Sequence, residues 1–277
     1  PAHLHHAPAK EFLDGALVDV FEMPHRAELI LQAVRVADLG PVVPPDDFGM
    51  APIQAVHTAD YLEFLQTAYA RWIADGRPAG AVYPDTFYKA AFQHRPTRIG
   101  ALAGIYMMDM SAPITGGTWH AAYWSAQTAL TAARLVRDGE RAAFALCRPP
   151  GHHAHADIAG GYCYLNNVAI AAQWLRANGV ARVSILDIDV HHGNGTQHIF
   201  YARDDVQFVS LHGDPDWEYP YFLGGRDERG AGAGLGFNHN HPLPKGADTR
   251  HFLDELDAAC AEIAEFRPDC LLVSLGV

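Results

Sequence analysis

The sequence predicts an α/β fold with a central multistranded parallel sheet flanked by helices. In the second half of the chain, short apolar runs typical of strands alternate with stretches of helical periodicity. Strands that alternate with helices form parallel sheets covered on both faces. The 277 residues, of which 49% are apolar and 19% charged, are typical of a globular chain with a well-buried core.

Four runs in the second half have the composition of strands, and they cover residues 142–147, 182–188, 206–211 and 269–275. The first run ends at Arg148-Pro-Pro-Gly151, which is typical of a rigid turn. A helix is predicted over residues 167–177, because apolar residues recur at helical spacing until a C-cap signal at Asn178-Gly179. A second helix is predicted over residues 248–266, after a glycine-rich stretch at 224–236.

The first half is predicted to be more helical, with helices over residues 25–38, 61–75 and 121–138. Residues 76–118 are rich in glycine, proline and aromatic residues and lack clean periodicity. Because so long a segment is unusual as a simple connection, we predict an active-site or dimerisation insertion there. The chain has no internal repeat or low-complexity linker, so we predict a single domain over residues 1–277.

Charge and cysteine content exclude several classes of protein. Lys and Arg number 20 against 32 Asp and Glu, and the net charge of −12 argues against nucleic acid and favours cationic ligands. No apolar run reaches the roughly 18 residues that a membrane-spanning helix needs, and no signal peptide is evident. The four cysteines lack C-x-x-C spacing, so we expect buried, reduced thiols in a cytoplasmic protein: Cys147, Cys163, Cys260 and Cys270.

Histidine is unusually frequent, with 17 residues in the chain. Seven fall within 61 positions: His152, His153, His155, His191, His192, His198 and His212. Imidazoles are common metal ligands and act as acids or bases near neutral pH. The cluster therefore predicts a functional site.

The first motif, Leu186-Asp-Ile-Asp-Val-His-His-Gly-Asn-Gly195, ends an apolar strand. Side chains alternate along a strand, so Asp187, Asp189 and His191 point in one direction. An unpartnered buried carboxylate costs several kcal/mol, and carboxylate plus imidazole suits a divalent ion such as zinc. An acidic strand end that merely caps the next helix is the alternative, but three aligned ligand-type residues favour a metal.

The second motif, Arg148-Pro-Pro-Gly-His-His-Ala154, follows another predicted strand. Ligands of open parallel sheets bind beyond the carboxyl ends of the strands. His152 and His153 could therefore supply a general base and a charge stabiliser, with Asp187 and Asn194 as candidate partners. Two surface histidines in a loop are the alternative. We predict that the two strand-end loops converge around one divalent ion.

The third motif, Gly160-Gly-Tyr-Cys-Tyr-Leu-Asn-Asn167, permits close backbone approach and offers Tyr162 either as an aromatic wall or as a core aromatic. Together with SLHGDP at 210–215, the motifs RPPGHHA, GGYCYLNN and LDIDVHHGNGTQ resemble those of the histone deacetylase-like amidohydrolases. Among these amidohydrolases, the chain most resembles the bacterial acetylpolyamine amidohydrolases. The resemblance runs along the whole chain and implies an arginase/deacetylase-like fold.

The resemblance also implies two metal sites. One zinc ion would be held by Asp189, by His191 and by a further aspartate immediately after Val277. We therefore expect the intact enzyme to continue beyond Val277, where an oxyanion-stabilising tyrosine is also expected, and a 277-residue chain to bind zinc poorly. A structural potassium ion would be held by Asp187, the Ser210 hydroxyl and the backbone oxygens of Asp189, His191 and Leu211.

The same resemblance assigns roles in amide hydrolysis. His153 would be the general base and acid, and His152 would stabilise charge with Asp187 as its partner. Asn194 would support His153. Zinc would polarise the acetyl carbonyl and activate water, and the products would be acetate and a free amine.

Substrate residues implied by the resemblance are Tyr162 and Tyr219 as aromatic walls, the backbone of Gly161 and the acidic Glu11. Polyamine-selective relatives carry further acidic residues, but Gly100 and Ser111 stand near those positions, with Asp109 close by. A homodimer is expected, because dimerisation shapes the gorge of such relatives. Small acetylated cationic amines are the predicted substrates.

Three other functions remain open from sequence. The same chemistry could act on acetyl-lysine in proteins. A manganese ureohydrolase of arginase type shares the fold, but the tandem histidines disfavour a binuclear site. A non-catalytic amine-binding module would not require the metal.

Overall fold

A computed structural model of the chain describes residues 2–13, 15–88 and 96–276. The chain divides into two compact units, residues 1–167 and residues 168–277. The predicted insertion at 76–118 belongs to the first unit, and its residues 89–95 lie outside the described part. The single domain over 1–277 stays a prediction.

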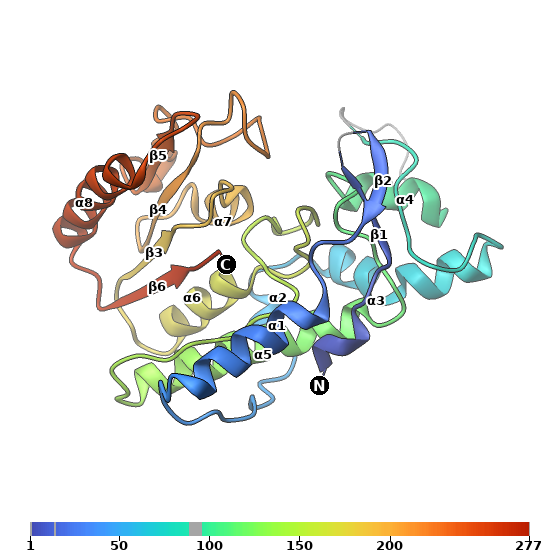
Figure 1. Cartoon of the computed structure of the whole chain (residues 1–277), viewed down its shortest axis with the longest axis horizontal. Helices are drawn as coiled ribbons and strands as arrows, with labels where there is room; N and C mark the ends of the chain where they lie inside the picture. Colours follow the sequence, from blue (N-terminus) through green and yellow to red (C-terminus); the bar gives the residue numbers. More distant parts are fainter. Residues whose placement is uncertain (1, 14, 89–95, 277) are drawn as a thin grey trace. The chain divides into compact units, whose positions relative to one another are not determined.

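The first unit is mainly helical, as predicted (Figure 1). Its elements are the 3-10 helix η1 (Ala2–His5), strands β1 (Lys10–Leu13) and β2 (Ala16–Asp19), and helices α1 (Pro24–Val36), α2 (Ala51–Gln54), α3 (Ala59–Ala74), α4 (Ile99–Tyr106) and α5 (Thr118–Arg137). The three helices expected here are confirmed as α1, α3 and α5. Helix α4 is a helical piece of the kind expected within residues 76–118, whereas the hairpin β1–β2 and the short helix α2 were not predicted.

Helix α3 shows how apolar spacing builds the core of this unit. Tyr61, Phe64, Leu65 and Ala68 recur at intervals of three and four residues, and each is at most 3% exposed. Burying a large apolar side chain of this kind contributes about 1.5–3 kcal/mol. The Tyr61 hydroxyl is also satisfied, because it donates to the Tyr164 carbonyl oxygen at 2.7 Å.

The second unit holds the predicted parallel sheet. Helix α6 (Asn167–Ala177) begins at the boundary, followed by β3 (Val183–Asp187), α7 (Asn194–Phe200), β4 (Val206–Gly213), the 3-10 turn η2 (Gly232–Gly234), β5 (Asn238–Leu243), α8 (Thr249–Phe266) and β6 (Cys270–Ser274). The strands lie in the order β5-β4-β3-β6, and each neighbouring pair is parallel. All carboxyl ends therefore meet at one edge.

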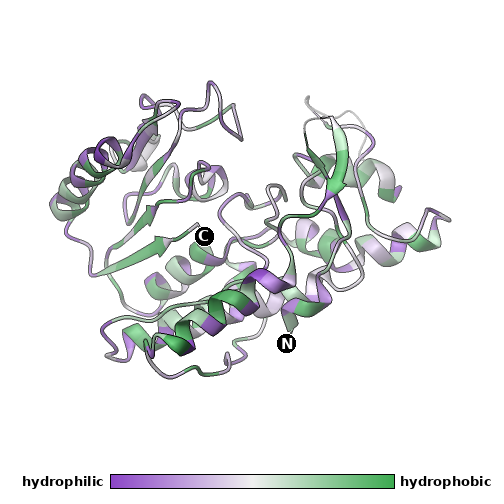
Figure 2. Ribbon diagram, viewed as in Figure 1, coloured by the Kyte–Doolittle hydropathy of each residue, from purple (hydrophilic) through white to green (hydrophobic). Residues whose placement is uncertain are grey.

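Helix α8 covers one face of this sheet (Figures 1 and 2). Ala259 and Ile263 of α8 pack on Leu186 of β3 and on Val209 and Leu211 of β4. The Asp248 side chain caps the helix by accepting from the His251 backbone N–H at 2.9 Å. The anchored helix thereby fixes the strands whose ends carry the first motif.

Two strand predictions fail for physical reasons. Residues 142–147 form no strand, since apolar composition supplies no ladder partner, and Phe144 is 55% exposed. Conversely β5, with the sequence NHNHPL, was missed because it lacks apolar alternation. Its buried polar side chains are partnered instead, as when Asn238 and Asn240 each donate to Gln197 Oε1 at 2.9 Å.

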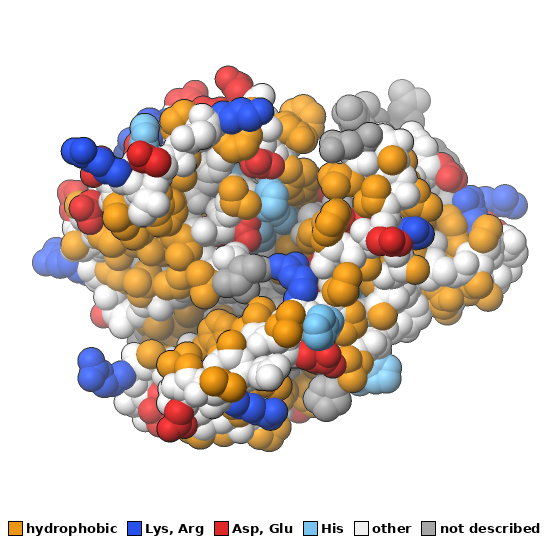
Figure 3. Space-filling view, in the orientation of Figure 1, with side chains coloured by type: hydrophobic (Ala, Val, Ile, Leu, Met, Phe, Trp, Pro, Cys, Tyr) orange, Lys and Arg blue, Asp and Glu red, His pale blue; other side chains and the backbone are white. Residues whose placement is uncertain are grey.

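Surface features complete the description. The edge strand β6 leaves Leu271 and Val273 about half exposed, and hydrophobic side chains are visible around β6 and α8 in Figure 3.

All four cysteines are free, but only Cys163 is buried and Cys260 is exposed, which corrects the expectation of four buried thiols. Within the described residues, no helix is long and apolar enough to cross a membrane.

Candidate functional site

The carboxyl end of β3 presents the first motif. Asp187 is fully buried and lies in register with Ser210 of β4 and Ser274 of β6. Its Oδ1 accepts from the Asp189 backbone N–H at 3.2 Å. A Cβ at Gly193 would lie 2.4 Å from Asp187 Oδ2, so only glycine leaves room for this carboxylate. Gly193, which follows the two histidines, thus leaves space for the buried Asp187 carboxylate.

Asp189 and His191 lie beside one another just beyond the strand. Asp189 Oδ1 accepts from the His191 backbone N–H at 2.8 Å and lies 3.1 Å from His191 Nδ1. Two ligand atoms on one tetrahedral zinc ion lie about 3.3–3.6 Å apart, given Zn–N and Zn–O bonds of about 2.0–2.2 Å. A Cβ at Gly276 would come within 2.1 Å of Asp189 Oδ2, so this glycine makes room for the carboxylate. The donor pair therefore fits zinc.

The part of the chain that is described holds no set of three or more His, Cys, Asp or Glu side chains placed to bind a metal. The assignment of Asp189 and His191 as zinc ligands, with a further aspartate after Val277, stays a prediction.

Ser210, Leu211 and His212 occupy the neighbouring strand β4. Burial is the main cause that lowers the pKa of His212, so its ring is neutral. His212 Nε2 lies 3.0 Å from the Gly224 carbonyl oxygen and must donate to it, which leaves Nδ1 to accept from the Ser210 hydroxyl at 2.9 Å. The lone pairs of Ser210 Oγ thus stay available to a cation.

Helix α7 begins at Asn194, directly after the Gly193 cap. Asn194 is 2% exposed, and its backbone N–H donates to the His192 carbonyl oxygen at 2.8 Å. The structure thus places Asn194 at the start of α7, directly after the turn that follows β3.

Sequence reasoning missed a polar cluster behind this turn. Gln197 of α7 accepts from His192 Nε2 at 3.1 Å and donates to the Glu228 carboxylate. Glu228 also accepts from the backbone N–H groups of Gly224 and Gly225 at 3.0 and 3.1 Å. The cluster ties α7 to the glycine-rich stretch, and the only signal for it was Gln197 at the end of the motif.

Tyr219 lies on the loop after β4. Its ring meets the His191 ring edge-on, with centroids 5.8 Å apart and planes at 82°. The Gly213 backbone N–H donates to the Val190 carbonyl oxygen at 2.8 Å, which joins the end of β4 to the first motif. The second unit thereby brings Tyr219 beside the predicted metal ligands.

The first unit carries the tandem histidines. His152 and His153 are 9% and 3% exposed, and their ring centroids lie 4.0 Å apart. The turn is tight, because a Cβ at Gly151 would come within 2.5 Å of the Asn167 backbone nitrogen. Burial rules out the alternative of two surface histidines.

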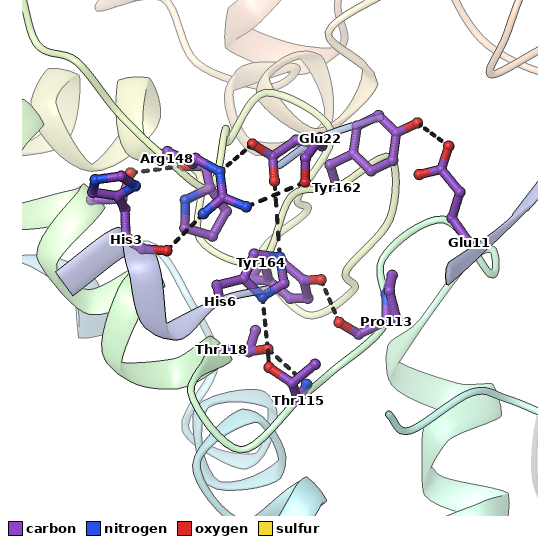
Figure 4. A network of polar contacts seen from close by, with 12 residues as sticks. His3, His6, Glu11, Glu22, Pro113, Thr115, Thr118, Arg148, Tyr162 and Tyr164 are labelled. Carbon is purple, nitrogen blue, oxygen red and sulfur yellow. Dashed lines mark hydrogen bonds and ion pairs between the residues drawn. The ribbon is translucent and has the colours of Figure 1, made fainter. Parts of the chain in front are cut away.

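A buried ion pair anchors the start of this loop (Figure 4). Arg148 Nε lies 2.7 Å from Glu22 Oε1, and the two side chains are 3% and 6% exposed. The guanidinium also donates to the His3 carbonyl oxygen at 2.6 Å and to the Glu22 carbonyl oxygen at 3.2 Å. Burial lowers the pKa of nearby His6 to about 3, so Arg148 is the cation that balances Glu22.

The third motif brings Tyr162 to Glu11 (Figure 4). Tyr162 has a left-handed backbone (φ 66°), and its hydroxyl donates to Glu11 Oε1 at 3.0 Å. Glu11 is 1% exposed, and burial raises its pKa while the Tyr162 hydrogen bond opposes that rise. The Gly161 backbone N–H donates to Asp109 Oδ2 at 2.9 Å. Glu11 is therefore a buried support of Tyr162.

Each unit thus gathers its own share of the predicted residues. The first unit holds Glu11, His152, His153, Gly161 and Tyr162. The second holds Asp187, Asp189, His191, Asn194, Ser210, Leu211 and Tyr219. The first unit thus supplies two buried imidazoles, and the second supplies a carboxylate–imidazole pair just beyond the end of β3.

Residues 20–277 match the family model of the histone deacetylase domain. The chain therefore belongs to the histone deacetylase family, as its motifs predicted, and the α/β fold is confirmed.

Within that family the chain is similar to acetylpolyamine amidohydrolases. It is 53% identical over 278 residues to acetylpolyamine amidohydrolase 1 of Pseudomonas aeruginosa, covering 99% of this chain and 80% of the relative. It is 45% identical over 267 residues to the acetylpolyamine amidohydrolase of Mycoplana ramosa, covering 96% and 78%. A crystal structure of acetylpolyamine aminohydrolase from Burkholderia pseudomallei matches with a TM-score of 0.95 and 49% identity, over 100% of this chain and 80% of that one.

Proposed function

We propose that this protein is a zinc-dependent amidohydrolase that deacetylates small acetylated amines, acetylpolyamines in particular. The observation that carries the proposal is the 53% identity over 99% of the chain to a relative named acetylpolyamine amidohydrolase. The net charge of −12 supports a cationic substrate, because it favours the approach of protonated amines.

The proposed zinc ligands are Asp189 and His191, with the expected aspartate after Val277 as the third. The 3.1 Å separation of Asp189 Oδ1 and His191 Nδ1 supports this assignment. When bound, zinc would polarise the acetyl carbonyl and lower the pKa of a water molecule towards about 7. His191 must offer an unprotonated Nδ1 to the metal, so its ring proton resides on Nε2.

His153 is the proposed general base, which takes a proton from the attacking water and later delivers one to the leaving amine. His152 is proposed to stabilise the developing charge. Asp187 and Asn194 take the supporting roles that the family resemblance gives them. Burial of both imidazoles in a tight turn supports these roles, because proton transfer needs a fixed ring.

A structural potassium ion is proposed beside Asp187. Its donors would be the Asp187 carboxylate, the Ser210 hydroxyl and the backbone oxygens of Asp189, His191 and Leu211. The register that sets Ser210 opposite the buried Asp187 supports this site. A cation there would balance a carboxylate that is fully withdrawn from water.

Tyr162, Tyr219 and the Gly161 backbone are proposed to line the channel for the acyl group. Glu11 is proposed to contribute by holding the Tyr162 hydroxyl, in keeping with its buried carboxylate. A homodimer is proposed on the family resemblance alone, and gel filtration tests it.

The test is acetate release by the full-length, zinc-loaded protein. We expect turnover of N-acetylated diamines and polyamines, loss of turnover with a chelator, and a 10²–10⁴-fold lower kcat for His153→Ala. Acetyl-lysine peptides assayed in parallel distinguish a protein deacetylase. The proposal fails if the zinc-loaded protein releases no acetate from any acetylated amine or peptide.

A further inference from the structure

The loop after β4 holds a carboxylate whose role the proposed function leaves open. Glu218 lies in a helical turn, where the Asp214 carbonyl oxygen accepts from the backbone N–H groups of Trp217 and Glu218, each at 3.0 Å. The Asp214 backbone N–H in turn donates to the Leu243 carbonyl oxygen at 2.9 Å, which ties the turn to the end of β5. The position of Glu218 is therefore set by the sheet.

The stem of the Glu218 side chain lies close to the end of β4. A Cβ at Gly213 would lie 3.0 Å from both Cβ and Cγ of Glu218. Such a contact is tighter than ordinary van der Waals packing. Gly213 thus lets the stem of Glu218 lie directly against the end of the strand.

The carboxylate points at a predicted zinc ligand. Glu218 Oε1 lies 3.7 Å from His191 Nε2, while Nδ1 on the other side of the same ring lies 3.1 Å from Asp189 Oδ1. The Tyr219 ring meets His191 edge-on. Each nitrogen of the imidazole therefore has its own carboxylate.

A neutral imidazole carries one proton, and the hydrogen bond made by one nitrogen decides which nitrogen is free to bind a metal. A ring that offers Nδ1 to zinc must carry its proton on Nε2, which faces Glu218. Carboxylates that accept this second proton orient the ring and raise its basicity as a ligand.

We propose that Glu218 is a positioning residue that accepts the Nε2 proton of His191 and holds its Nδ1 toward the metal. The inference rests on the proposed function, since it assumes that His191 binds zinc. The proposal requires the present 3.7 Å between Glu218 Oε1 and His191 Nε2 to close to the 2.7–3.2 Å of a hydrogen bond. Loss of such a partner typically weakens metal binding 10–100-fold.

The experiment compares Glu218→Ala, Glu218→Gln and Asp216→Ala in the full-length protein. Gln keeps an acceptor oxygen but loses the charge. Asp216 is an exposed carboxylate on the same turn, so its removal controls for net charge and loop composition. The zinc dissociation constant is measured by competition with a chelator, and cobalt-loaded samples report the ligand geometry by their visible absorption bands.

We expect zinc affinity to fall 10–100-fold in Glu218→Ala, with altered cobalt bands, to recover in part in Glu218→Gln, and to stay unchanged in Asp216→Ala. Wild-type zinc affinity and cobalt bands in Glu218→Ala overturn the inference, even if activity on cationic amines falls, which would indicate substrate recognition. Failure of the wild-type protein to bind zinc overturns the proposed function itself, and the inference with it.

Discussion

The buried ion pair between Arg148 and Glu22 offers a quantitative test of how the tandem-histidine loop is held. Arg148→Met removes the cation but keeps most of the side-chain volume. Glu22 is then left buried and uncompensated, since its carboxylate is 2.7 Å from Arg148 Nε in the wild type. The carbonyl oxygens of His3 and Glu22 lose a donor as well.

Breaking a buried pair on one side costs about 3–5 kcal/mol. We therefore expect Arg148→Met to lower the free energy of unfolding by about 4 kcal/mol at pH 7.5. For a unit of this size each kcal/mol shifts the midpoint by about 2–4 °C, so the expected drop in Tm is about 8–16 °C. Thermal and urea unfolding measure both quantities.

The loss of stability in Arg148→Met should depend on pH in a definite direction. Burial raises the pKa of Glu22, and Arg148 opposes that rise. In Arg148→Met the folded-state pKa of Glu22 moves higher still, so the folded state binds a proton that the unfolded state does not. The deficit relative to wild type should shrink as pH falls from 7.5 towards about 5.

The double variant Arg148→Met/Glu22→Gln serves as the matched control. It contains no buried lone charge, so we expect it to be about 1–3 kcal/mol more stable than Arg148→Met and to lack the pH-dependent recovery. The reasoning is refuted if the single and double variants unfold alike at pH 7.5, or if acidification leaves the deficit of Arg148→Met unchanged.

Two further predictions concern buried groups. Burial lowers the pKa of His57 to about 4, so its share of the stability is present above pH 6.5 and is lost as pH falls towards 4. His57→Gln can still accept from the Asn166 N–H and donate to the Ala156 carbonyl oxygen, and it should reduce the loss between pH 7 and 5 by about 2 kcal/mol in urea titrations; an unchanged pH slope would contradict this. Gly193→Ala should lower kcat at least ~10²-fold because its Cβ would displace Asp187, and a wild-type kcat would show that this carboxylate can move without consequence.

The sequence by itself determined those features that depend only on the chemistry of consecutive residues. The first motif was recognisable because carboxylates and an imidazole alternate at the end of an apolar run. An apolar core without a partner for them would make their burial costly. Helix α8 was predicted over residues 248–266, and the structure has it at Thr249–Phe266. The family followed from four such motifs in a fixed order.

Only the tertiary structure decided the features that depend on non-local pairing. β5 begins with four polar residues, Asn238 to His241, and forms a strand because β4 pairs with it and Gln197 satisfies its amides. Residues 142–147 are apolar, yet no described strand pairs with them. The facing of Glu218 and His191, 27 positions apart in the chain, arises from a turn fixed by hydrogen bonds to the sheet. The composition of a segment indicates whether its side chains can be buried, whereas the neighbouring strand or loop determines which groups those side chains contact.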